Sequence, residues 1–378
     1  MRLPPLKESA LWLYTNLRGW RTRRKLVVFE SDDWGAIRMP GQHAYDALLA
    51  AGIRVDRSPY DRLDCLERRE DLDALFQVLD TYRDARGGAA KFTFNTIMGN
   101  PDFEAIRRDG FERFHHQHIF DSYRDYHGDN LERVWRDAML EGLIKPQFHG
   151  REHLNSMLWM RDLTTGVRET RAAFEYRFYG LRAQTSSRWQ HHYKAAHCAE
   201  SPDEMREIGR IATDGLDIFE QTFGFRSSTF VACNYVLPAE LEGHLAGQGI
   251  SMIQTQRGYV QPQPGDEGRR KLVYRYPGQA NSYGQRYSVR NILFEPYLDG
   301  GQDWCERAIG EMALAFRLGK PAVICTHRVN YVGGMDVQHR DSSLAQLERF
   351  LSAMLQRWPD LEFISSDELA HAMGAAGA

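Results

Sequence analysis

Two adjacent acids, Asp32 and Asp33, closely follow the apolar run Lys25–Phe29. If that run is a β-strand, it delivers both carboxylates to one loop. Two carboxylates held this close do not both ionise freely near neutral pH unless a cation or a strong hydrogen-bond donor lies beside them. The pair therefore indicates a local positive charge, for which a bound metal ion is the natural candidate. The structural alternative is an Asx turn that leaves the strand, with Gly35 and Pro40 completing the loop.

A second candidate is the histidine pair His149 and His153, which comes directly after the apolar run Lys145–Phe148. Histidines at i and i+4 face the same way on a helical turn, so both imidazoles could bind one metal ion. The spacing alone is weak, because a chain with 14 histidines shows it by chance. Combined with the carboxylate pair, it predicts a site of two histidines and one aspartate with positions open for water and substrate.

The same segment has an alternative interpretation as the H-x-x-E-H signature of inverted zinc proteases. That signature requires both histidines and Glu152 to lie within one continuous helix. Pro146 lies three residues before His149 and Gly150 follows it, which favours a transition from strand to turn. Glu152 would then lie behind the ligands or at the surface.

A third element is His327, which ends the apolar run Ala322–Thr326. Histidine is the side chain whose ordinary pKa best suits proton donation near neutral pH. At the end of a strand it could donate a proton to a substrate beside the other candidates. The alternative is a histidine that only satisfies backbone groups.

The elements that must position these side chains are short apolar runs, most of them followed by stretches with helical character. This alternation predicts a mainly parallel sheet, open or closed into a barrel, with functional groups after the carboxyl ends of its strands. The acids, His149 and His327 all stand at such ends. The runs are Lys25–Phe29, Lys91–Asn95, Lys145–Phe148, Ser228–Ala232, Ser251–Gln254, Asn291–Phe294, Ala322–Thr326 and Leu361–Ile364.

Two stretches, about residues 100–140 and 157–200, are rich in aromatic, histidine and charged residues and look like insertions into the repeating plan. Long insertions of this kind form lids or walls over a site, and aromatic faces suit sugar rings. The alternative for these two stretches, equally compatible with their composition, is a subunit interface. The tail 373–378 is expected to be frayed.

Composition narrows the class of protein. The chain of 378 residues is 42% hydrophobic, enough for one large α/β domain or two smaller ones. Its formal charge of −3 gives no reason to expect a nucleic-acid partner. Five scattered cysteines form no C-x-x-C pair, which indicates reduced thiols. Since neither a span of roughly 18 apolar residues nor a signal peptide is visible, we expect a cytoplasmic protein.

Residues 1–25 carry seven basic residues against one acid, Glu8. With Leu13, Leu17 and Trp20 spaced i, i+4 and i+7, the segment predicts a short basic amphipathic helix that could lie on an anionic membrane surface. The alternative is a helix that plugs one end of the domain. The first interpretation predicts a cytoplasmic protein with peripheral membrane contact.

Taken together, these motifs resemble the metal-dependent polysaccharide deacetylases of the carbohydrate esterase type, which contain a NodB-like homology domain. The similar elements are Phe29–Asp33, the strand Ala90–Asn95, the pair His149 and His153, and Cys325–His327, in the family's order. The resemblance implies an irregular (β/α)7-type barrel over residues 25–372 with helical and loop insertions, preceded by the basic segment 1–24.

The resemblance also implies the site residues. Asp33, His149 and His153 would bind one divalent metal ion, with zinc the first choice and cobalt, nickel, manganese or iron also compatible. Asp32 would be the general base and His327 the acid that protonates the departing amine.

Substrate contacts are implied less completely. Trp34 stands where the family usually has glycine, and we expect it to line the sugar-binding surface with Asn234 and Tyr235. The family's Arg-x-Pro-Tyr segment has no full counterpart near Tyr235, which leaves the arginine partner of Asp32 unassigned. Asp303-Trp304 is similar to a motif that tunes the acid histidine.

The expected activity is removal of an N-acetyl or other acyl group from an amino sugar in a glycan, a lipid-linked or nucleotide sugar, or a nascent polysaccharide. The alternatives are the H-x-x-E-H protease, a non-catalytic glycan-binding relative, an iron oxygenase and a two-acid glycosidase. Iron oxygenases usually space one histidine and the acid two residues apart, unlike Asp33 and His149. A metal requirement would argue against the glycosidase.

Overall fold

The computed structural model describes residues 15–187, 189–262 and 270–374. In this part of the chain the main sheet comprises nine strands in the order β10-β7-β6-β5-β2-β1-β12-β11, with β13 paired to the start of β1. All of these pairings are parallel. The strands are β1 (Lys25–Trp34), β2 (Phe92–Ile97), β5 (Ile144–Gly150), β6 (Thr229–Val231), β7 (Met252–Thr255), β10 (Arg286–Val289), β11 (Ile292–Leu293), β12 (Ala322–His327) and β13 (Leu361–Phe363).

One extended segment, Arg286–Leu293, brings the two ends of the sheet together. Its β10 half pairs with β7 and its β11 half pairs with β12. Between them, Arg290 N donates to Thr255 O at 2.9 Å and Asn291 N donates to Val323 O at 3.1 Å. If β10 and β11 are counted as one strand, the parallel strands close into an irregular ring of seven. The predicted fold class, an α/β (β/α)7-type barrel with insertions, is confirmed.

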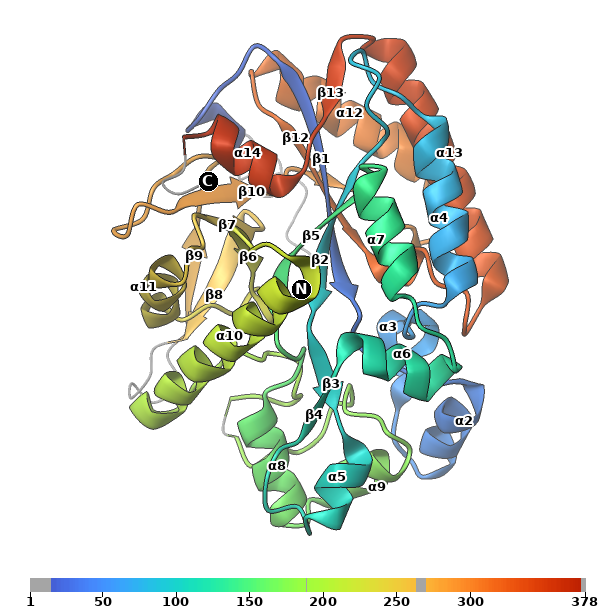
Figure 1. The fold of residues 1–378 in the computed structure, drawn as a ribbon, viewed down its shortest axis with the longest axis vertical. Helices are drawn as coiled ribbons and strands as arrows, with labels where there is room; N and C mark the ends of the chain where they lie inside the picture. Colours follow the sequence, from blue (N-terminus) through green and yellow to red (C-terminus); the bar gives the residue numbers. More distant parts are fainter. Residues whose placement is uncertain (1–14, 188, 263–269, 375–378) are drawn as a thin grey trace.

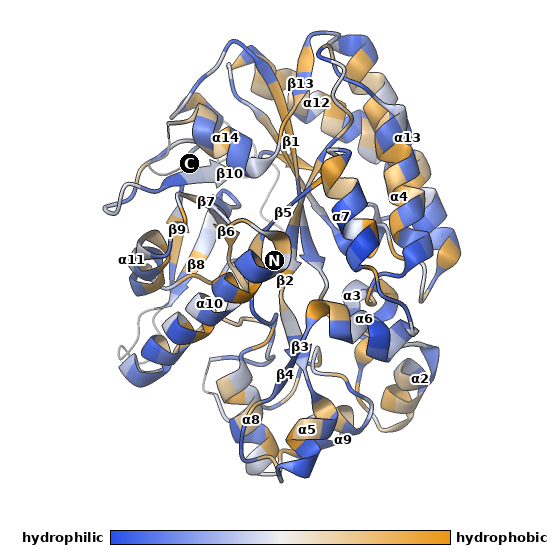
Figure 2. Ribbon diagram, in the orientation of Figure 1, coloured by the Kyte–Doolittle hydropathy of each residue, from blue (hydrophilic) through white to orange (hydrophobic). Residues whose placement is uncertain are grey.

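Helices cover the outside of the ring. The buried residues of α10, among them Ile208, Ala212, Leu216 and Phe219, recur at helical spacing, and Figure 2 shows hydrophobic and hydrophilic residues alternating along this helix. The α-helices are α2 (Gln42–Ala50), α3 (Pro59–Leu63), α4 (Arg69–Thr81), α5 (Phe103–Arg108), α6 (Ile119–His127), α7 (Glu132–Leu140), α8 (Ser156–Thr164), α9 (Arg168–Glu175), α10 (Pro202–Phe223), α11 (Ala239–Gly247), α12 (Trp304–Arg317), α13 (Val337–Arg357) and α14 (Ser366–Ala372). The 3-10 turns are η1 (Val55–Arg57), η2 (Cys233–Tyr235), η3 (Pro296–Leu298) and η4 (Arg328–Asn330).

The insertions gather at one end of the barrel. Figure 1 shows α5, α8 and α9 below the sheet, at the end toward which β1 and β2 point. The first insertion is shorter than predicted, because α7 is a regular barrel helix whose Trp135 packs on Phe94 of the sheet. It contains the antiparallel pair β3 (Gly99–Pro101) and β4 (His116–His118). A third insertion, the hairpin of β8 (Gly258–Pro262) and β9 (Arg270–Tyr274), was not predicted.

Of the predicted N-terminal helix, residues 1–14 lie outside the described ranges. The helix does not continue beyond Leu17, so the predicted helical face is wrong at Trp20. Trp20 instead packs against the small core cluster around Leu26, and its backbone N–H donates to Pro277 O at 2.8 Å. Met373, predicted to be frayed, is buried in the same cluster. No helix in the described ranges is both long and apolar enough to span a bilayer.

Candidate active site

Asp32 and Asp33 occupy an irregularity near the end of β1. Between Ser31 and Trp34 the register of β1 against β2 shifts, and Asp33 has a left-handed backbone with φ of 76°. In a regular strand consecutive side chains point to opposite faces, and a bulge breaks that alternation. Both carboxylates therefore line the same cavity. On the other side of β1 the parallel register sets Asp32 beside His327 of β12.

Asp33 stands at the centre of a buried cluster. Its Oδ1 lies 3.5 Å from His149 Nε2 and 3.2 Å from His153 Nε2, and it accepts a hydrogen bond from Arg38 Nη2 at 3.0 Å. Burial would raise the pKa of Asp33, but the Arg38 guanidinium and the neighbouring imidazoles outweigh it and hold that pKa well below its ordinary value. The carboxylate is therefore anionic, with two imidazole nitrogens facing one of its oxygens.

The two histidines reach this position without a helix, which confirms the strand-to-turn transition predicted from Pro146 and Gly150. His149 lies in β5 and His153 in the loop that follows Gly150. His149 Nδ1 lies 2.9 Å from Val231 O, which makes Nδ1 the donor and leaves Nε2 as the free acceptor. Burial and the charge of Arg38 hold the pKa of His153 well below its ordinary value, so its imidazole is neutral.

Glu152 is not placed as the glutamate of an H-x-x-E-H protease, since it does not line the cavity. Both of its oxygens accept hydrogen bonds from Arg151, from Nε at 2.6 Å and from Nη2 at 2.9 Å. The helix that the H-x-x-E-H signature requires is absent from residues 149–153, all of which are described. The geometry therefore gives the protease alternative no support.

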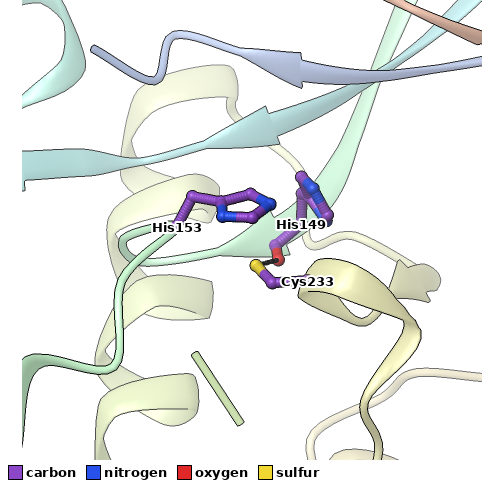
Figure 3. Close-up of side chains that lie close together, drawn as sticks. All are labelled: His149, His153 and Cys233. Atoms are coloured by element: carbon purple, nitrogen blue, oxygen red, sulfur yellow. Dashed lines mark hydrogen bonds between the residues drawn. The ribbon is translucent and has the colours of Figure 1, made fainter. Parts of the chain in front are cut away.

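Cys233 joins the histidine cluster, as Figure 3 shows. One ligand atom from each of His149, His153 and Cys233 lies within 4.8 Å of the others, and all three residues are buried. The Cys233 thiol donates to His149 O at 3.4 Å. Two imidazole nitrogens and a carboxylate oxygen, with a thiol close by, are a donor set that suits a divalent transition metal. Sequence reasoning missed Cys233 because it belongs to no spaced cysteine motif.

Arg38 is itself held in a buried network behind Asp33. Its Nε lies 3.4 Å from Asp64 Oδ2, and Asp64 in turn accepts hydrogen bonds from Arg328. Arg328 also donates to Glu67, whose other oxygen accepts Gly35 N–H at 2.9 Å. Acids and bases thus alternate from Asp33 to the loop after β1, which fixes the loop and the orientation of Arg38.

Asp32 has its own cationic partner, Arg290, in the segment that closes the barrel. Arg290 Nη1 donates to Asp32 Oδ2 at 2.6 Å and Nη2 donates to Oδ1 at 2.7 Å. Asn95 Nδ2 donates to the same Oδ1 at 2.7 Å, and Glu30 holds Arg290 Nε at 2.7 Å. Burial opposes the charge of Asp32, but Arg290 outweighs it and lowers the pKa of that carboxyl. This arginine, which the resemblance left unassigned, lies outside the expected segment.

His327 contacts Glu295 through Nδ1, while its Nε2 lies 3.6 Å from Asp32 Oδ2. Burial alone would lower the pKa of His327, but the Glu295 carboxylate reverses the effect and raises it to about 9. Asn330 donates to the other oxygen of Glu295 at 2.8 Å. Asp303, expected to tune this histidine, instead caps α12 and bonds Arg349 at the surface.

The candidate residues surround one cavity of about 270 Å³. Tyr235 lines it, with its hydroxyl 2.5 Å from Arg290 Nη1, and Asn234 lines it from a left-handed backbone. Trp34 does not line it, so that prediction is wrong. It is 1% exposed and stacks on Phe94 at 3.7 Å under the helices. The lining residues are Asp32, Asp33, Arg38, Tyr60, His149, His153, Lys194, Ala232, Asn234, Tyr235, Gln256, Tyr297 and His327.

Comparisons with known proteins were made by family, by sequence and by structure. No protein-family model and no curated protein matches the chain. Similar solved structures include a polysaccharide deacetylase from Mycobacterium smegmatis, with 13% identity over 94% of this chain and 93% of that one (TM-score 0.45). Another polysaccharide deacetylase, from Pseudomonas aeruginosa PAO1, shows 12% identity over 93% and 90% (TM-score 0.43). A glycoside hydrolase/deacetylase from Parabacteroides distasonis shows 11% over 93% and 71% (TM-score 0.48).

Proposed function

We propose that this protein is a metal-dependent hydrolase that removes an N-acetyl or other acyl group from an amino sugar in a glycan, a lipid-linked sugar or a nascent polysaccharide. One observation carries the proposal. The donor atoms of Asp33, His149 and His153 converge on one side of a cavity, and Asp32 and His327 meet at 3.6 Å on the same cavity. Such a site combines ligands for a Lewis acid with a base and an acid.

Asp33, His149 and His153 would hold the ion. When bound, a divalent ion supplies a water of lowered pKa and polarises the amide carbonyl. The hydrogen bond of His149 to Val231 O fixes the tautomer that such a ligand needs. Cys233 adds a soft sulfur atom within reach of both imidazoles, which favours zinc over harder cations.

Asp32 would accept the proton of the attacking water. Arg290 and Asn95 hold both of its oxygens in place, so the carboxylate is anionic and oriented at neutral pH. Burial raises the pKa of Asp32, but the charge of Arg290 outweighs burial and lowers it. Asp32 is therefore a weak base that stays ionised near neutral pH.

His327 would protonate the departing amine. With Nδ1 directed at Glu295, its Nε2 carries a proton on the cavity side, and a pKa of about 9 keeps the imidazole protonated at neutral pH. A positioned acid of this kind contributes roughly 10²–10⁴-fold to the rate. The base and the acid are therefore in the required protonation states at the same pH.

The test combines metal analysis of the purified protein with acetate release from N-acetylated saccharides. Asp32→Asn should keep the metal and lose turnover, whereas His149→Ala should lose both. His43→Ala, which alters an exposed histidine away from the cavity, is the control and should change neither. Equal metal loss in the Asp32 and His149 variants would contradict the assigned roles.

A further inference from the structure

Lys194 lines the catalytic cavity, yet the reaction proposed above gives it no task. It belongs to the irregular segment between α9 and α10, and its side chain is 17% exposed. Its Nζ makes no hydrogen bond to any described residue, and the nearest carboxylate oxygen of an ion pair, Asp61 Oδ1, lies 3.8 Å away. A largely buried ammonium group that lacks a hydrogen-bond acceptor is costly unless something else supplies one.

An ion pair with Asp61 does not account for this placement. At 3.8 Å the pair lacks a hydrogen bond, and a buried ion pair without close hydrogen bonds recovers little of its desolvation cost. Burial lowers the pKa of Lys194, while burial of Asp61 raises the pKa of that acid. Each charge is thus poorly compensated by the other. An anion in the cavity would complete the surroundings of Lys194.

Two arginines, Arg182 and Arg270, lie close to the segment that contains Lys194. Arg182 and His192 face each other in an antiparallel bridge, and Arg270 of β9 donates to Trp189 O in the arm between them. Burial and the charges of Lys194, Arg182 and Arg270 lower the pKa of His192 to about 4. The imidazole of His192 is therefore neutral near pH 7, whereas Arg182 and Arg270 add positive charge near Lys194. Positive charge beside a cavity attracts anionic substrates.

We propose that Lys194 is the anion-binding subsite of this cavity and receives a carboxylate or phosphate group on the amino sugar. The substrate would then be an acidic N-acyl sugar, so the inference rests on the proposed function and narrows its substrate class. A charge-assisted hydrogen bond of this kind changes affinity by roughly 10- to 100-fold.

Equilibrium binding to the full chain tests the subsite without requiring turnover. The probes are N-acetylglucosamine, its 6-phosphate, and the corresponding uronic acid, measured by calorimetry. The wild-type protein should bind at least one acidic probe about tenfold or more tightly than the neutral one. The phosphate and carboxylate arms show which anion the site receives.

Substitutions assign the preference to Lys194. Lys194→Met should remove it, and Lys194→Arg should restore part of it. Lys271→Met, which removes an exposed lysine of β9 outside the cavity lining, should leave it unchanged. Equal binding of all three probes by the wild-type protein overturns the inference, even if Lys194→Met fails to fold. A preference for acidic probes that survives in a folded Lys194→Met protein also overturns it.

Failure of the proposed function gives a different result. If no N-acylated sugar releases its acyl group, the hydrolase proposal fails. A charge preference that depends on Lys194 would still support the subsite in that case. Conversely, acyl release with equal affinity for neutral and acidic probes would keep the hydrolase and refute the subsite.

Discussion

Glu295→Gln tests the assignment of His327 as the acid. The Glu295 carboxylate contacts Nδ1 and, against the effect of burial, raises the pKa of His327 to about 9. Relative to an ordinary histidine pKa of about 6.5, this corresponds to about 3 kcal/mol of preference for the protonated imidazole. Glutamine keeps the shape of the side chain and removes its charge. Burial, the largest single influence, is then opposed only by the charges of Asp32 and Asp33, and the pKa should fall toward the ordinary value of about 6.5.

The expected change in rate follows from the fraction of protonated acid. At a pH of about 7.5, a histidine with a pKa of about 9 is almost fully protonated, whereas one with a pKa of about 6.5 is protonated in about a tenth of the molecules. Because the acid must carry its proton to act, kcat/KM should fall about tenfold at that pH. The alkaline limb of the pH profile should move from about 9 toward about 6.5.

The assay pairs the pH profile of kcat/KM with an NMR titration of the His327 ring. Metal content should remain equal to wild type, since Glu295 contacts none of the proposed ligands. Glu306→Gln removes the same charge from the exposed first turn of α12 and is the matched control. An alkaline limb that stays near pH 9, with His327 still titrating there, would refute the reasoning.

Three further predictions use the same structure. Arg290→Met leaves Glu30 and Asp32 buried without their cation and should lower the free energy of unfolding by about 3–5 kcal/mol in urea denaturation; a loss below about 1 kcal/mol would count against this. Trp34→Ala should lower the free energy of unfolding by a similar amount, about 3–5 kcal/mol, because the packing on Phe94 is lost. KM should stay unchanged, and a raised KM would instead indicate that Trp34 contacts the sugar. We also propose that the basic segment of residues 1–25 contacts anionic membranes. A chain without residues 1–24, which contain six of the seven basic residues, should no longer sediment with anionic lipid vesicles, and undiminished sedimentation would refute it.

The barrel was predictable because its strands are buried on both faces. Such strands are continuous apolar runs, and each of the eight predicted runs overlaps a strand of the main sheet. Strand β10 was missed because Arg286-Tyr-Ser-Val289 mixes polar and apolar residues. The placement of the acids, His149 and His327 at one end of the barrel followed from the rule for parallel strands.

Other parts of the site were not predicted. Arg290, in long-range contact with Asp32, precedes the predicted run Asn291–Phe294, and no spacing along the chain marks it. Glu295, the partner of His327, directly follows that run, so the rule for strand ends could have found it. Trp34 was misplaced because the register shift after Ser31 cannot be read from the alternation of β1. The shift places Trp34 against Phe94 beneath the helices.

The different roles proposed for Asp32 and Asp33 rest on the cation that each carboxylate contacts. Arg290 binds both oxygens of Asp32, and Glu30 holds that guanidinium from behind, so neither oxygen is directed at the imidazole pair. Asp33, turned by its left-handed backbone, meets Arg38 and both imidazoles through a single oxygen. A metal ion can therefore share Asp33 with the two histidines, while Asp32, facing His327 across 3.6 Å, is placed to exchange a proton. The register shift in β1 is what gives two neighbouring acids these two separate environments.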